Sequence, residues 1–314
     1  MSTPIKKVIL VGASGNLGPH ILSALLASSF TVTLLTRPTS TFPHPPSIPV
    51  LRASYKDLAA LKTAFTGQDA VVCALGFEGY KDQLLMINAA KEAGVKRFVP
   101  SEFGDVPRGK WEAGNEWEEL LKVKREVMEY LIEKTRQKEG EEEGMTWSAV
   151  ACGIFFDWSL TTFPTLGFDL KKRTATLYDT GHTPISGTTI AAIGTSVAHI
   201  LLNPSLFTNK FVKIASLVTT QCDMLATFES ITGQKWEVQH MGTKDVLERG
   251  KAKLAMGDFV EGFLDILIVH LFEKGVEGRE VTTVQGSDNE AVGVEGEDLE
   301  TVLRKCLETV GRAE

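Results

Sequence analysis

The segment VILVGASGNLG, residues 8–18, limits the folds open to this chain more than any other stretch. Four apolar residues lead into Gly12, Gly15 and Gly18, spaced G-x-x-G-x-x-G, and the helix-like segment PHILSALLA follows. In a strand, loop and helix unit, the first glycine allows the tight turn and the second lets the backbone approach a pyrophosphate. The third lets the helix pack closely on the strand. A glycine-rich turn without a ligand is the alternative, but the flanking strand and helix favour a dinucleotide site.

The first half of the chain alternates strand-like and helix-like segments, which predicts a parallel sheet with helices on both faces. The strands are apolar and rich in β-branched residues, as buried parallel strands are. We therefore expect an α/β fold with a Rossmann-type doubly wound parallel sheet. The expected strands are VILVG, TVTLLT, AVVCALG, RFVPS and TWSAVACGIFF, and the expected helices are 19–27, 57–65, 83–93 and 117–136.

The pattern becomes less regular after Phe156. Strands are expected at TATLYDT and KFVKIAS, and helices at 188–202, 221–232, 257–272 and 296–310. We divide the chain into a nucleotide-binding Rossmann domain, residues 1–152, and a substrate-binding region, residues 153–314, partly interleaved with the Rossmann sheet.

Composition excludes several classes of function. The 314 residues contain 33 Lys and Arg against 40 Asp and Glu, a net charge of -7, so nucleic acid is not an expected ligand. The longest later apolar segment, FLDILIVHLF, is too short for a membrane span and is expected to be a core helix. The four cysteines form no C-x-x-C pair and the six histidines show no H-x-x-x-H spacing, so no metal site is expected. Widely spaced reduced thiols favour the cytoplasm.

The second expected strand ends at Thr36, and Arg37 follows it. An enzyme that binds NAD places an acidic residue there for the ribose hydroxyls. A guanidinium instead can bind a 2'-phosphate by charge-assisted hydrogen bonds, which favours NADPH. A surface arginine without this role is the alternative. Gly76 ends the strand AVVCALG beside the same crevice, where a glycine lets the chain pass close to a cofactor.

Four blocks of sequence resemble the isoflavone reductase-like, NmrA-like group of atypical short-chain dehydrogenases, its fungal members in particular. They are VGASGNLG with Arg37, DLAALKTAFTGQDAVV, AAKEAGVKRFVPSEFG and the helix around KREVMEYL, and weaker likeness continues in GIFFDW and ITGQKWEV. The resemblance implies a Rossmann domain for NADPH, a smaller C-terminal domain and a cleft between them. The implied cofactor-binding residues are Gly12, Ser14, Gly15, Asn16, Leu17, Gly18, Thr36, Arg37, Gly76, Ser101, Phe103 and Lys124.

The resemblance also implies a catalytic acid/base, the helix lysine Lys124. Hydride delivery to a conjugated acceptor leaves negative charge on an oxygen, which a proton donor or cation stabilises. We expect partial burial to lower the pKa of Lys124 toward the working pH. A solvated helix lysine is the alternative. A competing motif, Tyr130 with Lys134, reads Y-x-x-x-K, but lies too late in its helix to reach the cofactor.

Aromatic residues near the carboxyl edge of the sheet predict a pocket for a flat, apolar, aromatic or conjugated small molecule. Plain core packing is the alternative for each of them. The expected substrate-binding residues are Phe77, Phe103, Phe155, Phe156, Trp158 and His182, and Trp111 is a further lid residue. Asp157 either orients a substrate hydroxyl or caps the following helix.

The sequence is compatible with three functions. The leading one is an NADPH-dependent reductase of an aromatic or conjugated small molecule in specialised metabolism. A sensor that binds NADP(H) and a partner protein without catalysis is the second. The third is an isomerase or cyclase that uses NADP(H) without net redox change. The sequence leaves assembly into a homodimer open.

Overall fold

The computed structural model describes residues 4–105, 116–137, 144–273 and 282–312. Its largest feature is a sheet of seven strands that are all parallel, in the order β3-β2-β1-β4-β5-β6-β11. This order reverses direction between β1 and β4, as in a Rossmann fold, and confirms the predicted fold class. The strands are β1 Lys7–Val11, β2 Thr31–Thr36, β3 Val50–Arg52, β4 Ala70–Cys73, β5 Arg97–Val99, β6 Thr146–Ala151 and β11 Lys210–Lys213.

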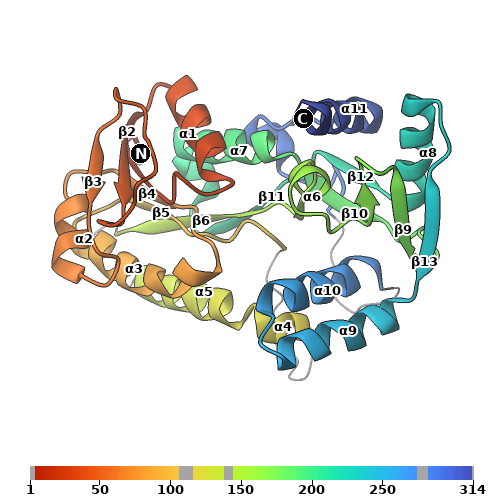
Figure 1. Ribbon diagram of the computed structural model, residues 1–314. Helices are drawn as coiled ribbons and strands as arrows, with labels where there is room; N and C mark the ends of the chain where they lie inside the picture. The colour runs from red at the N-terminus through yellow and green to blue at the C-terminus, as the bar shows by residue number, and fades with distance from the viewer. Residues whose placement is uncertain (1–3, 106–115, 138–143, 274–281, 313–314) are drawn as a thin grey trace.

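Helices cover both faces of this sheet (Figure 1). One face carries α1 Gly18–Ala27 and α7 Ile190–Leu202, whose apolar sides share a core cluster with β1 and β2. The other face carries α2 Leu58–Phe65, α3 Gln83–Glu92 and α5 Lys122–Thr135 over a second cluster. The single helix expected at 117–136 is divided into two helices, α4 Glu116–Leu120 and α5.

The second half of the chain contributes to the Rossmann sheet as well as to a smaller lobe. Strand β11 pairs with β6, and α7 packs on α1. The smaller lobe has two three-stranded sheets, β12-β10-β7 and β13-β9-β8, against a third core cluster. Their strands are β7 Ile154–Phe155, β8 Phe168–Asp169, β9 Thr174–Tyr178, β10 Ile185–Thr188, β12 Leu217–Thr219 and β13 Glu237–Met241.

Two helices, α9 Thr243–Ala255 and α10 Phe259–Phe272, lie side by side at the edge of the smaller lobe, and α10 also contacts α4 (Figure 1). The buried carboxylate of Asp265 in α10 joins them, since it accepts hydrogen bonds of 2.7 and 2.9 Å from Arg249 and lies 3.0 Å from Lys253. The remaining elements are the helices α6 Trp158–Thr161, α8 Gln221–Thr232 and α11 Leu299–Gly311, and the 3-10 helices η1 Phe77–Asp82, η2 Pro204–Phe207 and η3 Asn289–Val292.

Candidate active site

The glycine loop lies where the strand order reverses. Gly12 follows β1 with a φ of +87°, and a Cβ there would lie 2.3 Å from the carbonyl oxygen of Ala74, which follows β4. A Cβ on Gly18 would lie 2.3 Å from the carbonyl oxygen of Gly12. These two glycines let β1, β4 and α1 approach closely, as the sequence predicted.

The start of α1 is suited to a phosphate. No side chain caps this helix end. Pro19 has no N–H, and the N–H of His20 donates to the carbonyl of Leu17 at 3.1 Å, so the backbone N–H groups suited to an anion are those of the preceding loop and Gly18. These N–H groups and the helix dipole favour an anion. Ser14, Gly15 and Asn16 are exposed beside them, whereas Leu17 is buried in the core and could meet a ligand only through its backbone.

Arg37 is exposed immediately after β2, while Thr36 before it is buried. The backbone around Arg37 is held by Arg52 at the end of β3, whose guanidinium donates to the carbonyl oxygens of Arg37 and Ser40 at 3.4 and 2.8 Å. The Arg37 guanidinium therefore projects from a fixed backbone at the carboxyl edge of the sheet. Gly76 is also at this edge, and a Cβ there would meet no atom within 4 Å, which leaves room for a ligand.

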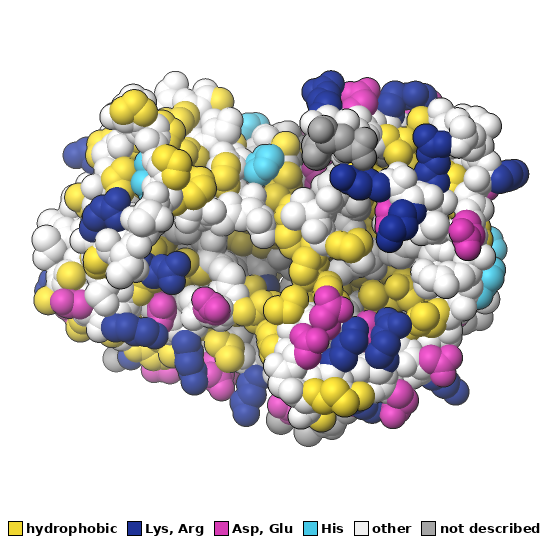
Figure 2. Space-filling view, viewed as in Figure 1, with side chains coloured by type: hydrophobic (Ala, Val, Ile, Leu, Met, Phe, Trp, Pro, Cys, Tyr) yellow, Lys and Arg dark blue, Asp and Glu magenta, His cyan; other side chains and the backbone are white. Residues whose placement is uncertain are grey.

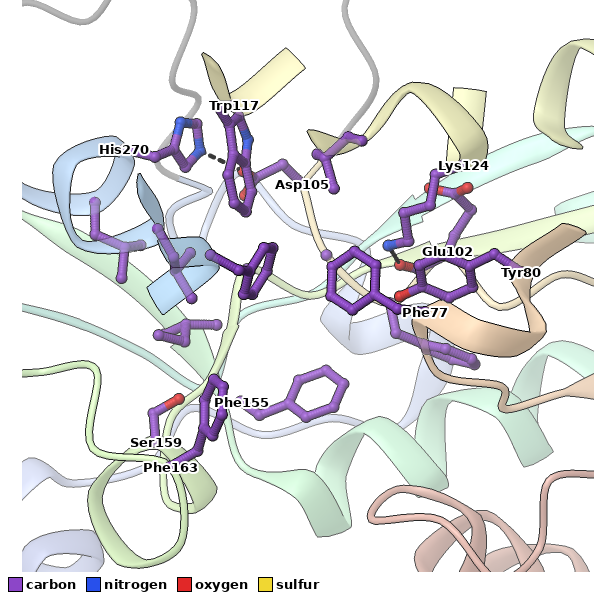
Figure 3. A pocket seen from close by; sticks show the side chains of 18 of the residues that line it. Phe77, Tyr80, Glu102, Asp105, Trp117, Lys124, Phe155, Ser159, Phe163 and His270 are labelled. Carbon is purple, nitrogen blue, oxygen red and sulfur yellow. Dashed lines mark hydrogen bonds and ion pairs between the residues drawn. The ribbon is translucent and has the colours of Figure 1, made fainter. Parts of the chain in front are cut away.

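A cavity of about 530 Å³ lies between the Rossmann sheet and the lobe that carries α10. Hydrophobic side chains gather along this boundary in the space-filling view (Figure 2). Figure 3 shows that polar side chains lie on two sides of an aromatic interior. The lining includes Phe77, Tyr80, Glu102, Phe103, Asp105, Trp117, Lys124, Phe155, Trp158, Phe163, Phe263 and His270. The volume suits a small aromatic ligand.

Lys124 lies on α5 and lines this cavity. Its Nζ atom donates a hydrogen bond to the backbone carbonyl of Glu102 and lies 5.5 Å from the centre of the Tyr80 ring. Burial on its own lowers the pKa of Lys124, but Tyr80, Glu102, Cys152 and Asp105 raise it above its ordinary value. The expectation that this pKa falls was wrong, because the charged and ionisable groups nearby outweigh desolvation. Lys124 is therefore a cation at neutral pH.

The loop that follows β5 is fixed beside Lys124 by hydrogen bonds. Ser101 donates through its hydroxyl to the carbonyl of Leu75 at 2.6 Å, and its backbone N–H donates to the side chain of Gln83 at 2.8 Å. The Ser101 side chain thus joins the ends of β4 and β5. Phe103 has a φ of 28°, which is unusual for a bulky residue and marks a locally strained loop at the cavity wall.

The structure brings most of the predicted aromatic residues to the cavity, but not all of them. Phe77, Phe103, Phe155 and Trp158 line it. Phe156 does not, because it has no exposed surface and packs in the core of the smaller lobe. Phe156 follows β7 in the turn before α6, and its side chain lies against Gly187 of β10 rather than in the cavity.

His182 is also absent from the cavity lining, since it is exposed in the turn after β9. Asp157 is a capping residue: one carboxylate oxygen accepts from the backbone N–H of Trp158 at 3.0 Å and from that of Ile190 at 2.9 Å. Trp111 lies outside the described residues.

The Y-x-x-x-K motif lies on α5 away from the cavity. The Tyr130 hydroxyl donates to Asn88 at 2.8 Å, and the Lys134 ammonium lies 4.9 Å from the Tyr130 ring. Neither residue lines the cavity, which agrees with the expectation that this motif sits too late in its helix.

Sequence reasoning missed a second polar cluster in the cavity wall. His270 of α10 is buried, its Nε2 lies 2.6 Å from Oδ2 of Asp105, and its ring stacks on Trp117 at 4.4 Å between ring centres. Asp265 and His270 interrupt the apolar run of α10, and that interruption was the only available signal. Tyr80 was also missed, since nothing near it in the sequence marks it.

In the described ranges, no group of three or more His, Cys, Asp or Glu residues is placed to hold a metal ion. The same part of the chain contains no helix with both the length and the apolar character needed to cross a bilayer.

Comparison with known proteins identifies the family. Residues 4–262 match the model of the NmrA-like family. The chain is 34% identical to the oxidoreductase poxI of Penicillium oxalicum over 300 residues, 94% of this chain and 92% of that protein. It is 26% identical to an isoflavone reductase of Pisum sativum over 77% of this chain and 80% of that one. A solved structure described as AtPrR2 with NADP+ and (+)pinoresinol is 20% identical, with a TM-score of 0.78 over 98% of this chain and 100% of that chain. The chain therefore belongs to the NmrA-like family and is an oxidoreductase of that family.

Proposed function

We propose that this protein is an NADPH-dependent reductase of an aromatic or conjugated small molecule, with Lys124 as its oxyanion-stabilising residue. The observation that carries the proposal is Lys124, which lies in the wall of an aromatic cavity and has a raised pKa. The related structure with NADP+ and (+)pinoresinol and the related isoflavone reductase support the cofactor and the aromatic substrate class.

The residues around the reversal point of the sheet fit a dinucleotide phosphate. Gly12 and Gly18 form the close cradle, the loop that leads into α1 offers backbone N–H groups to the pyrophosphate at the positive end of the helix dipole, and Arg37 offers a guanidinium to the 2'-phosphate. When bound, NADPH supplies a hydride to the substrate.

The chain's own contribution to the reaction is to place the substrate and hold the charge that develops. Phe77, Phe155 and Trp158 enclose a flat substrate and exclude water from it. The ammonium of Lys124 stabilises negative charge on the substrate's oxygen. A fixed cation in an apolar site stabilises such a charge more strongly than a cation in water does. The tie to the carbonyl of Glu102 keeps this cation in place.

The test is NADPH oxidation by the purified protein with a panel of conjugated carbonyl compounds and aromatic benzylic ethers. NADPH carrying deuterium at both C4 positions is expected to transfer one deuterium to a carbon of the product. A product that contains no deuterium would show chemistry without net redox change. No NADPH oxidation with any compound of the panel, together with a stable complex with another protein, would favour the non-catalytic NADP(H) sensor.

A further inference from the structure

Tyr80 lies beside Lys124 in the cavity wall, and no sequence motif marks it. Resting on the proposed function, we propose that Tyr80 is a further catalytic residue that donates the proton taken up by the substrate's oxygen. Lys124 then acts as the partner that holds the charge left on Tyr80.

The two side chains lie close together in the cavity wall although they come from different elements. Tyr80 belongs to η1 and Lys124 to α5. The Nζ atom of Lys124 lies 5.5 Å from the centre of the Tyr80 ring, and both residues line the same cavity. Figure 3 shows the tyrosine ring and the lysine side chain converging near the backbone of Glu102. The pair is thus open to a ligand on its cavity side.

Hydrogen bonds through Gln83 hold the backbone of Tyr80 in this position. The Gln83 side chain donates to the backbone carbonyl of Tyr80 at 3.3 Å and accepts from the backbone N–H of Ser101 at 2.8 Å. Gln83 is only 1% exposed, so this link is not shared with bulk water. It joins η1 to the loop after β5, which also carries the carbonyl that holds Lys124. Preorganised groups of this kind cost little reorganisation during a reaction.

The chemistry divides the two roles. Reduction adds a hydride from the reduced nicotinamide to a substrate carbon and moves the π-electron pair of the conjugated system onto its oxygen. The O–H bond of Tyr80 breaks, an O–H bond of the substrate forms, and the resulting phenolate lies beside the Lys124 ammonium. A proton from water then restores the phenol. Since its pKa is raised, Lys124 is a weak acid and better suited to hold charge than to release a proton.

The first test compares Tyr80→Phe with Tyr130→Phe. Tyr130 is a matched control, because its hydroxyl is bonded to Asn88 and it does not line the cavity. Loss of a positioned proton donor is expected to lower kcat about 10²–10⁴-fold in Tyr80→Phe. NADPH affinity, measured by fluorescence titration, should stay within about threefold of the parent, and Tyr130→Phe should keep the parent kcat.

The second test uses the protein without cofactor or substrate. Lysines are labelled by reductive ¹³C-methylation, the Lys124 signal is assigned with Lys124→Met, and its pKa is measured by NMR in the parent and in Tyr80→Phe. We expect the pKa of Lys124 to be lower in Tyr80→Phe, because Tyr80 contributes to raising it.

A parent kcat in Tyr80→Phe, or an unchanged Lys124 pKa, would overturn the inference. Neither result would remove the reductase, which fails only if the parent protein reduces no acceptor. In that case the NMR comparison, which needs no turnover, still decides whether the two residues form one unit.

Discussion

Replacement of Gly12 by alanine tests whether close approach at the reversal point of the sheet defines this fold. The new Cβ would lie 2.3 Å from the carbonyl oxygen and 2.8 Å from the carbonyl carbon of Ala74, both backbone atoms, at a φ of +87°. The left-handed conformation costs about 1–2 kcal/mol for a residue with a Cβ. The backbone shift that relieves the overlap costs about 1–3 kcal/mol more.

The expected loss of stability is therefore about 2–5 kcal/mol, a fall in Tm of about 4–20 °C for a domain of this size. Gly76→Ala is the matched control, since its Cβ would meet no atom within 4 Å and its φ is -81°. Its Tm is expected to stay within about 2 °C of the parent, or to rise slightly. Thermal unfolding of both variants without cofactor, followed by circular dichroism, makes the comparison. Equal Tm values for Gly12→Ala and the parent would refute the reasoning.

Two further predictions concern single charges. Arg37→Gln should weaken NADPH binding about 10–150-fold, which corresponds to one charged hydrogen bond of about 1.5–3 kcal/mol, and should leave NADH binding unchanged. Fluorescence titration with each nucleotide measures both affinities. An equal loss of affinity for both nucleotides would contradict the role of Arg37 in binding the 2'-phosphate. Burial alone raises the pKa of Asp265, but Arg249 and Lys253 outweigh it and hold this pKa below its ordinary value. The stabilisation is thus present above the unfolded pKa of about 3.9 and is lost as pH falls through the lower folded value. Asp265→Asn should have a lower Tm than the parent at pH 7, and this difference in Tm should become smaller below about pH 4. A difference in Tm that does not change with pH would show that the charge is not the cause.

The Rossmann sheet could be read from the sequence because its signals are local. The run before Gly12, the β-branched strands and the order of segments are each visible within a few residues. Lys124 and the loop at Ser101 to Gly104 could be named because a family resemblance spans them. The structure then places Lys124 in the cavity wall beside the carbonyl of Glu102.

What the sequence could not supply depends on contacts between distant segments. The raised pKa of Lys124 comes from Tyr80 and Asp105 as well as from its neighbour Glu102, and their distances follow only from the fold. Tyr80 and His270 are ordinary residues in their own segments and become wall residues only when η1 and α10 meet at the cavity. Phe156 shows the converse, because an aromatic residue beside a cavity residue can belong wholly to the core.

The role of Lys124 is the central claim, and the most direct measurement is single-turnover reduction by Lys124→Met with NADPH binding measured on the same sample. Loss of the cation that stabilises the oxyanion should slow the chemical step about 10²–10³-fold while NADPH affinity stays within about threefold of the parent. Reduction at the parent rate by a Lys124→Met protein that binds NADPH normally would contradict the account.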